Sequence, residues 1–349
     1  MLPERKVFSA EKLAAAEARL DQLWAKGRAL LGTRTAIMGG AMTWVSERNL
    51  VAAISNAGGF GVLATGSMSP QQLDAEIAAT FARTQEPFGV NLITMHPQLG
   101  ELIDVCIGRK VTHVVLAGGV PKAADVKRVK VGGPRVLVFA PAVALAHRLT
   151  RAGADGVIVE GNEAGGHVGP VSTSVLAQEI LPAVRDVPVF VAGGIGRGEA
   201  IAAHLEMGAA GCQLGTRFVC ATESIAHPNF KQAFLRANAR DAIPSVQLDP
   251  RFPVIPVRAI QNVGTRRFHE FQREVIGEFL SGGLEQAAAQ LKIEHYWAGQ
   301  LRNAVINGDV ENGSLMAGQS VGMVTAIQPT AEIIATLVTE AITALARRA

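Results

Sequence analysis

Residues 189–218 read VFVAGGIGRGEAIAAHLEMGAAGCQLGTRF, and their pattern discriminates between the possible fold classes. An apolar run at 189–192 ends in a pair of glycines, and a stretch with helical spacing follows at 199–207. A second apolar run, 211–214, ends in a further glycine. Short apolar runs separated by one helix are typical of neighbouring parallel strands. The segment is therefore interpreted as one repeat of an α/β protein with a parallel sheet.

The same alternation extends over most of the chain. Stretches with helical spacing include 49–57, 70–83, 142–152 and 175–184. Eight strands joined by such helices predict a (β/α)8 TIM barrel rather than an open Rossmann sheet, which usually has fewer strands. The glycines of 59–64 fit G-x-G-x-x-A, but they precede or begin the apolar run, so dinucleotide binding there is rejected. The expected strands lie near 35–38, 59–63, 88–91, 113–116, 135–139, 156–159, 189–192 and 211–214.

Three regions are expected, because 349 residues exceed the size of one ordinary core. Residues 1–30 form an N-terminal helical extension with Leu13, Ala16, Leu20 and Leu23 on one face. Residues 31–226 and 314–349 form the barrel, which ends in an amphipathic helix. Residues 227–313, with a proline-rich stretch and long amphipathic segments, form an inserted helical lid subdomain.

Composition excludes several classes of protein. The net charge is only +3 and the basic residues are dispersed, which argues against a nucleic-acid partner. Cys106, Cys212 and Cys220 are widely spaced, so neither a disulfide framework nor a cysteine metal site is expected. No run approaches the ~18 apolar residues that a membrane span requires. A cytoplasmic protein without a membrane anchor is expected.

Two glycine loops predict a phosphate site. In a (β/α)8 barrel the active site lies at the C-terminal ends of the strands, and the loops after strands seven and eight commonly bind phosphate. Here these loops contain Gly193 and Gly194, and Gly215 and Thr216. Bare backbone amides and a threonine hydroxyl are donors that suit a phosphate. Tight βα turns are the alternative use of these glycines.

His167 is the candidate catalytic residue. It lies in the loop 160–169, EGNEAGGHVG, directly after the sixth apolar run. An imidazole with an unperturbed pKa near ~6.5 accepts or donates a proton at neutral pH. The alternative is a surface loop whose histidine faces water. Asn91 and Met42 would face the same end of the barrel as His167. The alternative role of Asn91 is to cap a helix or turn, and that of Met42 is to fill a gap in the core.

These motifs together resemble the FMN-dependent nitronate monooxygenases, formerly 2-nitropropane dioxygenases, and the flavin-type enoyl-ACP reductases. The resemblance spans roughly 33–340. This chain departs from it in having Gly39-Gly40-Ala41-Met42 where the family usually has Gln-Gly-Gly-Met, and in its extra N-terminal helix. The resemblance rests on 56–61 (NAGGFG), 87–91 (PFGVN), 163–169 (EAGGHVG), 192–195 (AGGI), 215–218 (GTRF) and 316–319 (MAGQ).

The resemblance implies an FMN site with His167 near the reactive edge of the flavin. The phosphate would be held by Gly193, Gly194, Gly215 and Thr216. The segment 316–319 would return from the lid to the flavin. The residues expected to bind the cofactor are Gly40, Ala41, Met42, Asn91, Ala164, Gly165, Gly166, Gly193, Gly194, Gln213, Leu214, Gly215, Thr216, Met316, Gly318 and Gln319.

Three functions are considered, and the resemblance implies the first two. The first is nitronate monooxygenase, which oxidises an alkyl nitronate to a carbonyl compound and nitrite. The alternative is an enoyl-ACP reductase, in which NADH or NADPH is the reductant and His167 or water supplies a proton. The third is a non-catalytic flavin-binding protein. The expected partner is a small-molecule substrate, with an acyl carrier protein only in the reductase case, and the resemblance also implies a homodimer.

Overall fold

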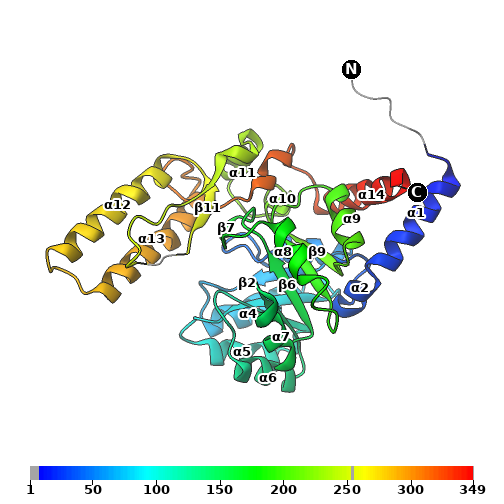
Figure 1. Ribbon diagram of the computed structural model, residues 1–349, viewed down its shortest axis with the longest axis horizontal. Coiled ribbons are helices and arrows are strands. Elements are labelled where there is room, and N and C mark those ends of the chain that lie inside the picture. The colour runs from blue at the N-terminus through cyan, green and yellow to red at the C-terminus, as the bar shows by residue number, and fades with distance from the viewer. Residues whose placement is uncertain (1–7, 253–254, 349) are drawn as a thin grey trace.

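The computed structural model describes residues 8–252 and 255–348, and its centre is a (β/α)8 barrel (Figure 1). The eight parallel strands are ordered β1-β9-β8-β6-β5-β4-β3-β2. A bridge from Met38 to Phe60 joins the two ends of this order. The predicted fold class is confirmed. The strands are β1 (Ile37–Gly39), β2 (Gly61–Ala64), β3 (Phe88–Ile93), β4 (His113–Ala117), β5 (Arg135–Phe139), β6 (Gly156–Glu160), β8 (Val189–Ala192) and β9 (Gly211–Leu214).

The strands are almost uniformly apolar because the packed barrel interior covers one face of the sheet and the helices cover the other. Val114, Val115 and Leu116 of β4 are each at most 1% exposed. The barrel helices are α3 (Arg48–Asn56), α4 (Pro70–Phe81), α5 (Leu99–Gly108), α6 (Ala123–Val131), α7 (Val143–Arg151), α8 (Thr173–Ile180), α9 (Gly198–Glu206) and α14 (Thr330–Arg348).

Helix α14 is the eighth barrel helix, and it packs against α9 and α3. The contact with α9 is very close at Gly198. A Cβ atom there would lie 2.0 Å from the carbonyl oxygen of Leu337, so only glycine fits. The final amphipathic stretch of the sequence therefore completes the barrel wall, although more than a hundred residues separate it from β9.

The N-terminal extension contains two helices, α1 (Ala10–Leu23) and α2 (Ala25–Leu31), where the sequence pattern indicated one. They meet at Trp24, which is buried. Helix α1 packs on α14. Helix α2 lies against the N-terminal end of the barrel, where His113 Nε2 is 2.8 Å from the Leu30 carbonyl oxygen. The first seven residues of the predicted extension lie outside the described residues.

The region 227–313 contains α11 (Pro228–Arg236), β10 (Ala242–Pro244), β11 (Val257–Ile260), α12 (Val263–Leu280) and α13 (Gln286–Asn307). We call it the insertion. Figure 1 shows α12 and α13 side by side, projecting away from the barrel. Their own small core consists of Phe252, Val257, Phe268, Val275, Ala289 and Ile293.

The insertion differs from the sequence expectation because it is not wholly helical. Strands β10 and β11 form a three-stranded antiparallel sheet with β7 (Gly166–His167). Strand β7 comes from the glycine loop after β6, so this sheet joins the insertion to the barrel. The remaining short elements are α10 (Thr216–Val219), η1 (Ala239–Asp241) and η2 (Gln319–Met323). Within the described residues, no helix has the length and apolar composition needed to cross a bilayer.

Candidate active site

The glycine loop after β6 carries His167 to an exposed position. Gly166 has φ +76°, a left-handed conformation that favours glycine. The backbone then pairs with β11, with His167 opposite Val257, and the amide of Val168 donates to the Pro256 carbonyl at 2.9 Å. The insertion therefore fixes the backbone of the candidate catalytic residue, while its side chain remains accessible.

Two polar anchors hold this loop. The Glu163 carboxylate accepts hydrogen bonds from the Thr173 amide and hydroxyl, each at 2.8 Å, at the start of α8. Arg258, only 5% exposed, donates from Nε to the Asn162 carbonyl at 2.8 Å and from Nη1 to Ala242 at 2.5 Å. Desolvation lowers the pKa of the Arg258 guanidinium, and the nearby charge of Glu163 opposes that shift. The loop is thus tied to both the barrel and the insertion.

The segment 316–319 returns from the insertion and lies directly on the glycine loop. The Gly318 amide donates to the Thr216 hydroxyl at 2.9 Å, and the Gln319 amide donates to the Glu163 carbonyl at 2.9 Å. A Cβ atom on Gly165 would lie 2.6 Å from the Gly318 nitrogen. The sulfur of Met316 is 3.6 Å from the Cβ position of Gly166. Three segments that are distant in sequence therefore meet backbone to backbone.

The predicted phosphate loops lie beside this junction. Gly193 and Gly194 have φ +94° and +73°, and side chains there would clash with the glycine loop. Among the described residues, the amides of Gly193, Gly194 and Gly215 have no hydrogen-bond acceptor. The Thr216 hydroxyl, which accepts from Gly318, still has its own proton to donate. This donor set suits a phosphate group.

The loop after β1 completes this side of the mouth. The Gly40 amide donates to the Leu214 carbonyl at 2.8 Å. The sulfur of Met42 is 3.4 Å from the Cβ position of Gly215, and Ala41 lies between Gly40 and Met42. Gln213 and Leu214, both buried, end β9 directly before Gly215, and Ala164 is buried in the glycine loop. The residues predicted to contact the cofactor, at the ends of β1, β6, β8 and β9 and in the segment 316–319, thus lie next to one another.

Asn91 lies apart from these residues, on β3. It is 5% exposed, its Nδ2 donates to the Val115 carbonyl at 3.2 Å, and its own carbonyl accepts from Thr65 at 2.5 Å. Asn91 therefore bonds to the neighbouring strand β4 and to the end of β2. A role in binding a cofactor stays a prediction for Asn91, as it does for the other expected site residues.

Glu160 is a further candidate site residue and is absent from the set predicted above. Glu160 is the last residue of β6, at the end of the barrel where active sites lie. Desolvation by burial raises its pKa to about 7, although the side chain is partly reachable by solvent. A carboxyl group with this pKa can hold or release a proton near neutral pH. An acidic residue directly after an apolar run was the sequence signal for this residue.

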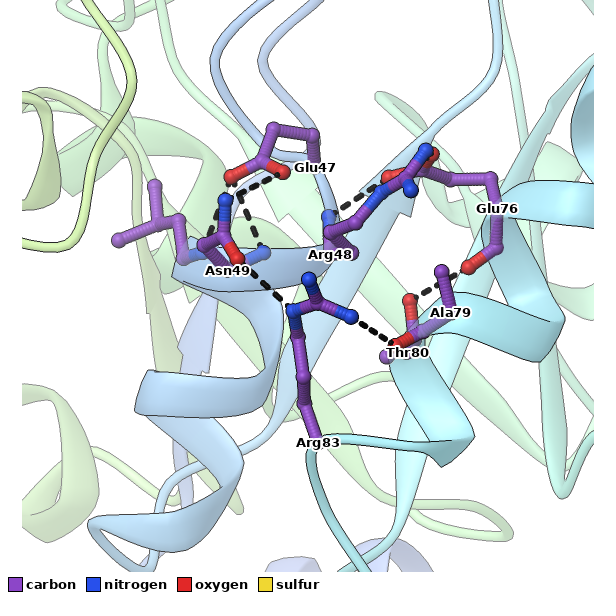
Figure 2. A network of polar contacts seen from close by, with 8 residues as sticks. Glu47, Arg48, Asn49, Glu76, Ala79, Thr80 and Arg83 are labelled. Atoms are coloured by element: carbon purple, nitrogen blue, oxygen red, sulfur yellow. Dashed lines mark hydrogen bonds and ion pairs between the residues drawn. The ribbon is translucent and has the colours of Figure 1, made fainter.

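The polar network in Figure 2 anchors the start of α3, which follows the β1 loop. The Glu47 carboxylate caps α3 by accepting from the amides of Asn49 and Leu50. Burial raises the pKa of Glu47. Arg48 bonds to the Glu76 carboxylate of α4 through its backbone amide, Nε and Nη2. The loop 40–47 is therefore fixed at its end as well as at Gly40.

Comparison with known proteins places the chain among flavin oxidoreductases. The family model described as nitronate monooxygenase matches residues 27–340. A (3aS,4S,5R,7aS)-5-hydroxy-7a-methyl-1-oxo-octahydro-1H-indene-4-carboxyl-CoA dehydrogenase of Mycobacterium tuberculosis is 31% identical, covering 90% of this chain and 95% of that protein. A probable nitronate monooxygenase of Staphylococcus aureus is 26% identical, covering 80% and 92%. FabK from Thermotoga maritima has a TM-score of 0.80 and 36% identity, covering 90% and 94%.

Proposed function

Because the chain belongs to the nitronate monooxygenase family, we propose that it is an FMN-dependent oxidoreductase that acts on an acyl thioester. It is an oxidoreductase, since its relatives are dehydrogenases and monooxygenases. Its family is flavin-dependent. The thioester substrate is the part of the proposal that goes beyond family membership.

The residues at the mouth fit FMN. The amides of Gly193, Gly194 and Gly215 and the Thr216 hydroxyl would hold its phosphate. The glycines at 165 and 166 let the segment 316–319, which is expected to contact the flavin, pack directly on this loop. When bound, FMN supplies the electron transfer that no protein side chain provides here.

The observation that carries the thioester proposal is the exposed position of His167. A proton donor at an open mouth can serve a substrate whose acyl group enters the barrel while its bulky carrier remains outside. In the proposed reaction an enoyl thioester gains a hydride at one carbon, with NADH or NADPH as the source of electrons. His167 or a water molecule supplies the proton at the other carbon.

The relatives support the same substrate class. The M. tuberculosis relative, which matches nearly the full length of both chains, is named for a carboxyl-CoA substrate. A relative from Rhodococcus jostii with the same name is 37% identical over 220 residues. The probable nitronate monooxygenases are less similar, at 26% identity for the S. aureus protein.

Nitronate oxidation is the second candidate, and the description of the family model favours it. The nitroalkane oxidase of Streptomyces ansochromogenes also has the same fold, with a TM-score of 0.76 and 28% identity. In this reaction the nitronate is oxidised by molecular oxygen to a carbonyl compound and nitrite. His167 would then face the anionic nitronate as a hydrogen-bond donor or proton carrier.

The two functions predict different behaviour of the purified protein with FMN. Under anaerobic conditions, NADH or NADPH should bleach the flavin absorbance, and an added enoyl thioester should restore it. Reduction by an alkyl nitronate with no response to NADH or NADPH would overturn the thioester proposal in favour of nitronate oxidation. Flavin binding without turnover of either substrate class would indicate a non-catalytic protein.

A further inference from the structure

Trp44, in the loop after β1, has an unusual backbone conformation. Its φ is +68°, and within the described residues only one other non-glycine residue, Lys110, has a positive φ. A bulky side chain rarely adopts this left-handed conformation, and surrounding contacts must impose it. The Ser46 hydroxyl provides such contacts, because it donates to the Gly40 carbonyl at 2.8 Å and accepts from the Met42 amide at 3.0 Å.

The indole of Trp44 meets a charged side chain of the insertion. The guanidinium carbon of Arg302, on α13, lies 5.5 Å from the centroid of the Trp44 ring. This part of α13 is firmly packed, since Leu301, Ala304 and Val305 are buried. The arginine therefore comes from a fixed helix and rests on a fixed ring.

Arg302 has capacity for a further partner. The residue is exposed, and no carboxylate of the described part of the chain lies within ion-pair distance of its guanidinium. A cation–π contact with a ring occupies the face of a guanidinium and leaves N–H donors at its edge. These donors match a phosphate group in geometry and charge.

The pair lies at the rim of the candidate active site. Loop 40–47 starts at the C-terminal end of β1, and Met42 of this loop contacts Gly215. The Thr43 hydroxyl is 3.4 Å from the Cβ position of Gly66, just after β2. Arg302 therefore stands where the insertion meets the β1 and β2 side of the mouth.

We propose that Arg302, held against Trp44, binds a phosphate group of the carrier that bears the acyl thioester. This inference rests on the proposed function and names the substrate feature that the rim recognises. The carrier that we assign is coenzyme A, whose phosphate groups supply this chemistry. The charged carrier would lie against the insertion, while its acyl group extends toward His167.

The test compares two substrates with the same enoyl group, one carried by coenzyme A and one by uncharged N-acetylcysteamine. Arg302→Gln should raise KM for the coenzyme A thioester by about tenfold, as expected for the loss of one charge-assisted hydrogen bond. The rise for the N-acetylcysteamine thioester should be several-fold smaller. Arg302→Lys should give an intermediate KM, since it keeps the charge and loses the planar fork.

The matched control is Arg273→Gln, an exposed arginine on α12 of the same insertion with no ion pair among the described residues. It should leave KM for both substrates unchanged. Trp44→Leu should raise KM for the coenzyme A thioester, because it removes the aromatic face under Arg302. An equal rise for both substrates in Arg302→Gln, or no rise, would overturn the proposal. Flavin content and thermal unfolding show whether each variant is folded.

A binding experiment separates failure of this inference from failure of the proposed function. Free coenzyme A is titrated calorimetrically into the FMN-loaded protein and into Arg302→Gln. If the wild type reduces neither thioester but binds coenzyme A, and Arg302→Gln binds it about tenfold more weakly, the proposed function fails and the phosphate site stands. If the wild type does not bind coenzyme A, the phosphate site is wrong, whatever the wild-type protein reduces.

Discussion

Substitution of Gly318 by alanine should destabilise the protein, because this residue lies where the returning segment meets the glycine loop. A Cβ atom on Gly318 would be 2.7 Å from the Glu163 carbonyl oxygen and 3.0 Å from the Gly165 nitrogen. Both neighbours are backbone atoms, so neither can rotate away as a flexible side chain could. The φ of Gly318 is −78°, which alanine adopts easily, so the expected effect comes from the contact alone.

The size of the destabilisation follows from the backbone segments that a Cβ atom on Gly318 would displace. The Cβ atom would be about 0.7 Å inside ordinary van der Waals contact, which begins at 3.4 Å. Moving the segment away lengthens two hydrogen bonds, from the Gly318 amide to Thr216 and from the Gln319 amide to Glu163. Each contributes about 0.5–1.5 kcal/mol, so we expect a loss of about 1–3 kcal/mol in the free energy of unfolding.

Urea unfolding of the apoprotein, followed by circular dichroism, measures this loss. FMN affinity should fall in the same variant, because Thr216 belongs to the predicted phosphate site. The control is Gly277→Ala on α12, where a Cβ atom meets nothing within 4 Å. That variant should be about 0.5–1 kcal/mol more stable than the wild type, owing to the higher helix propensity of alanine. A Gly318→Ala protein within about 0.5 kcal/mol of the wild type would refute the reasoning.

Three further variants test other parts of the structure. His167→Ala should lower kcat by about 100-fold or more without loss of bound flavin, and equal turnover would remove the catalytic assignment. Burial raises the pKa of Glu160 from 4.5 to about 7, so the folded protein holds a proton that the unfolded chain releases between these values. The free energy of unfolding should therefore decrease as the pH rises from about 4.5 through about 7, and Glu160→Gln should remove this part of the slope in urea titrations. Arg48→Ala should lower the free energy of unfolding by about 1–3 kcal/mol in thermal or urea titrations. The substitution leaves the Glu76 carboxylate, which is 5% exposed, with only the backbone amide of residue 48 as a partner. An unchanged stability would contradict this role of the network.

The barrel could be predicted from sequence because its signals are local. Each strand is a short apolar run, since both faces of a barrel strand are buried, and each run is followed by a helix with its own spacing. The glycine loops could also be found, because Gly193, Gly194 and Gly166 adopt left-handed conformations that other residues avoid. Strand and glycine positions thus predicted where the candidate site lies.

The features that the sequence did not reveal depend on contacts between distant segments. The two-residue strand β7 is too short to have a pattern, and it exists because β11 pairs with it. The desolvation of Glu160 likewise appears only when the chain folds and buries it. The positive φ of Trp44 belongs to a tight loop closed by the Ser46 hydroxyl, and no residue type in that loop indicates it. The break between α1 and α2 at Trp24 was missed because both helices follow the same apolar spacing.

The small sheet that joins β7 to β11 makes the insertion and the imidazole of His167 one mechanical unit. Because β11 lies between β10 and β7, a substitution that loosens the packing of the insertion would also shift the backbone at His167. The folding of α12 and α13 and the placement of the candidate catalytic side chain are therefore linked, although the two lie about a hundred residues apart in sequence.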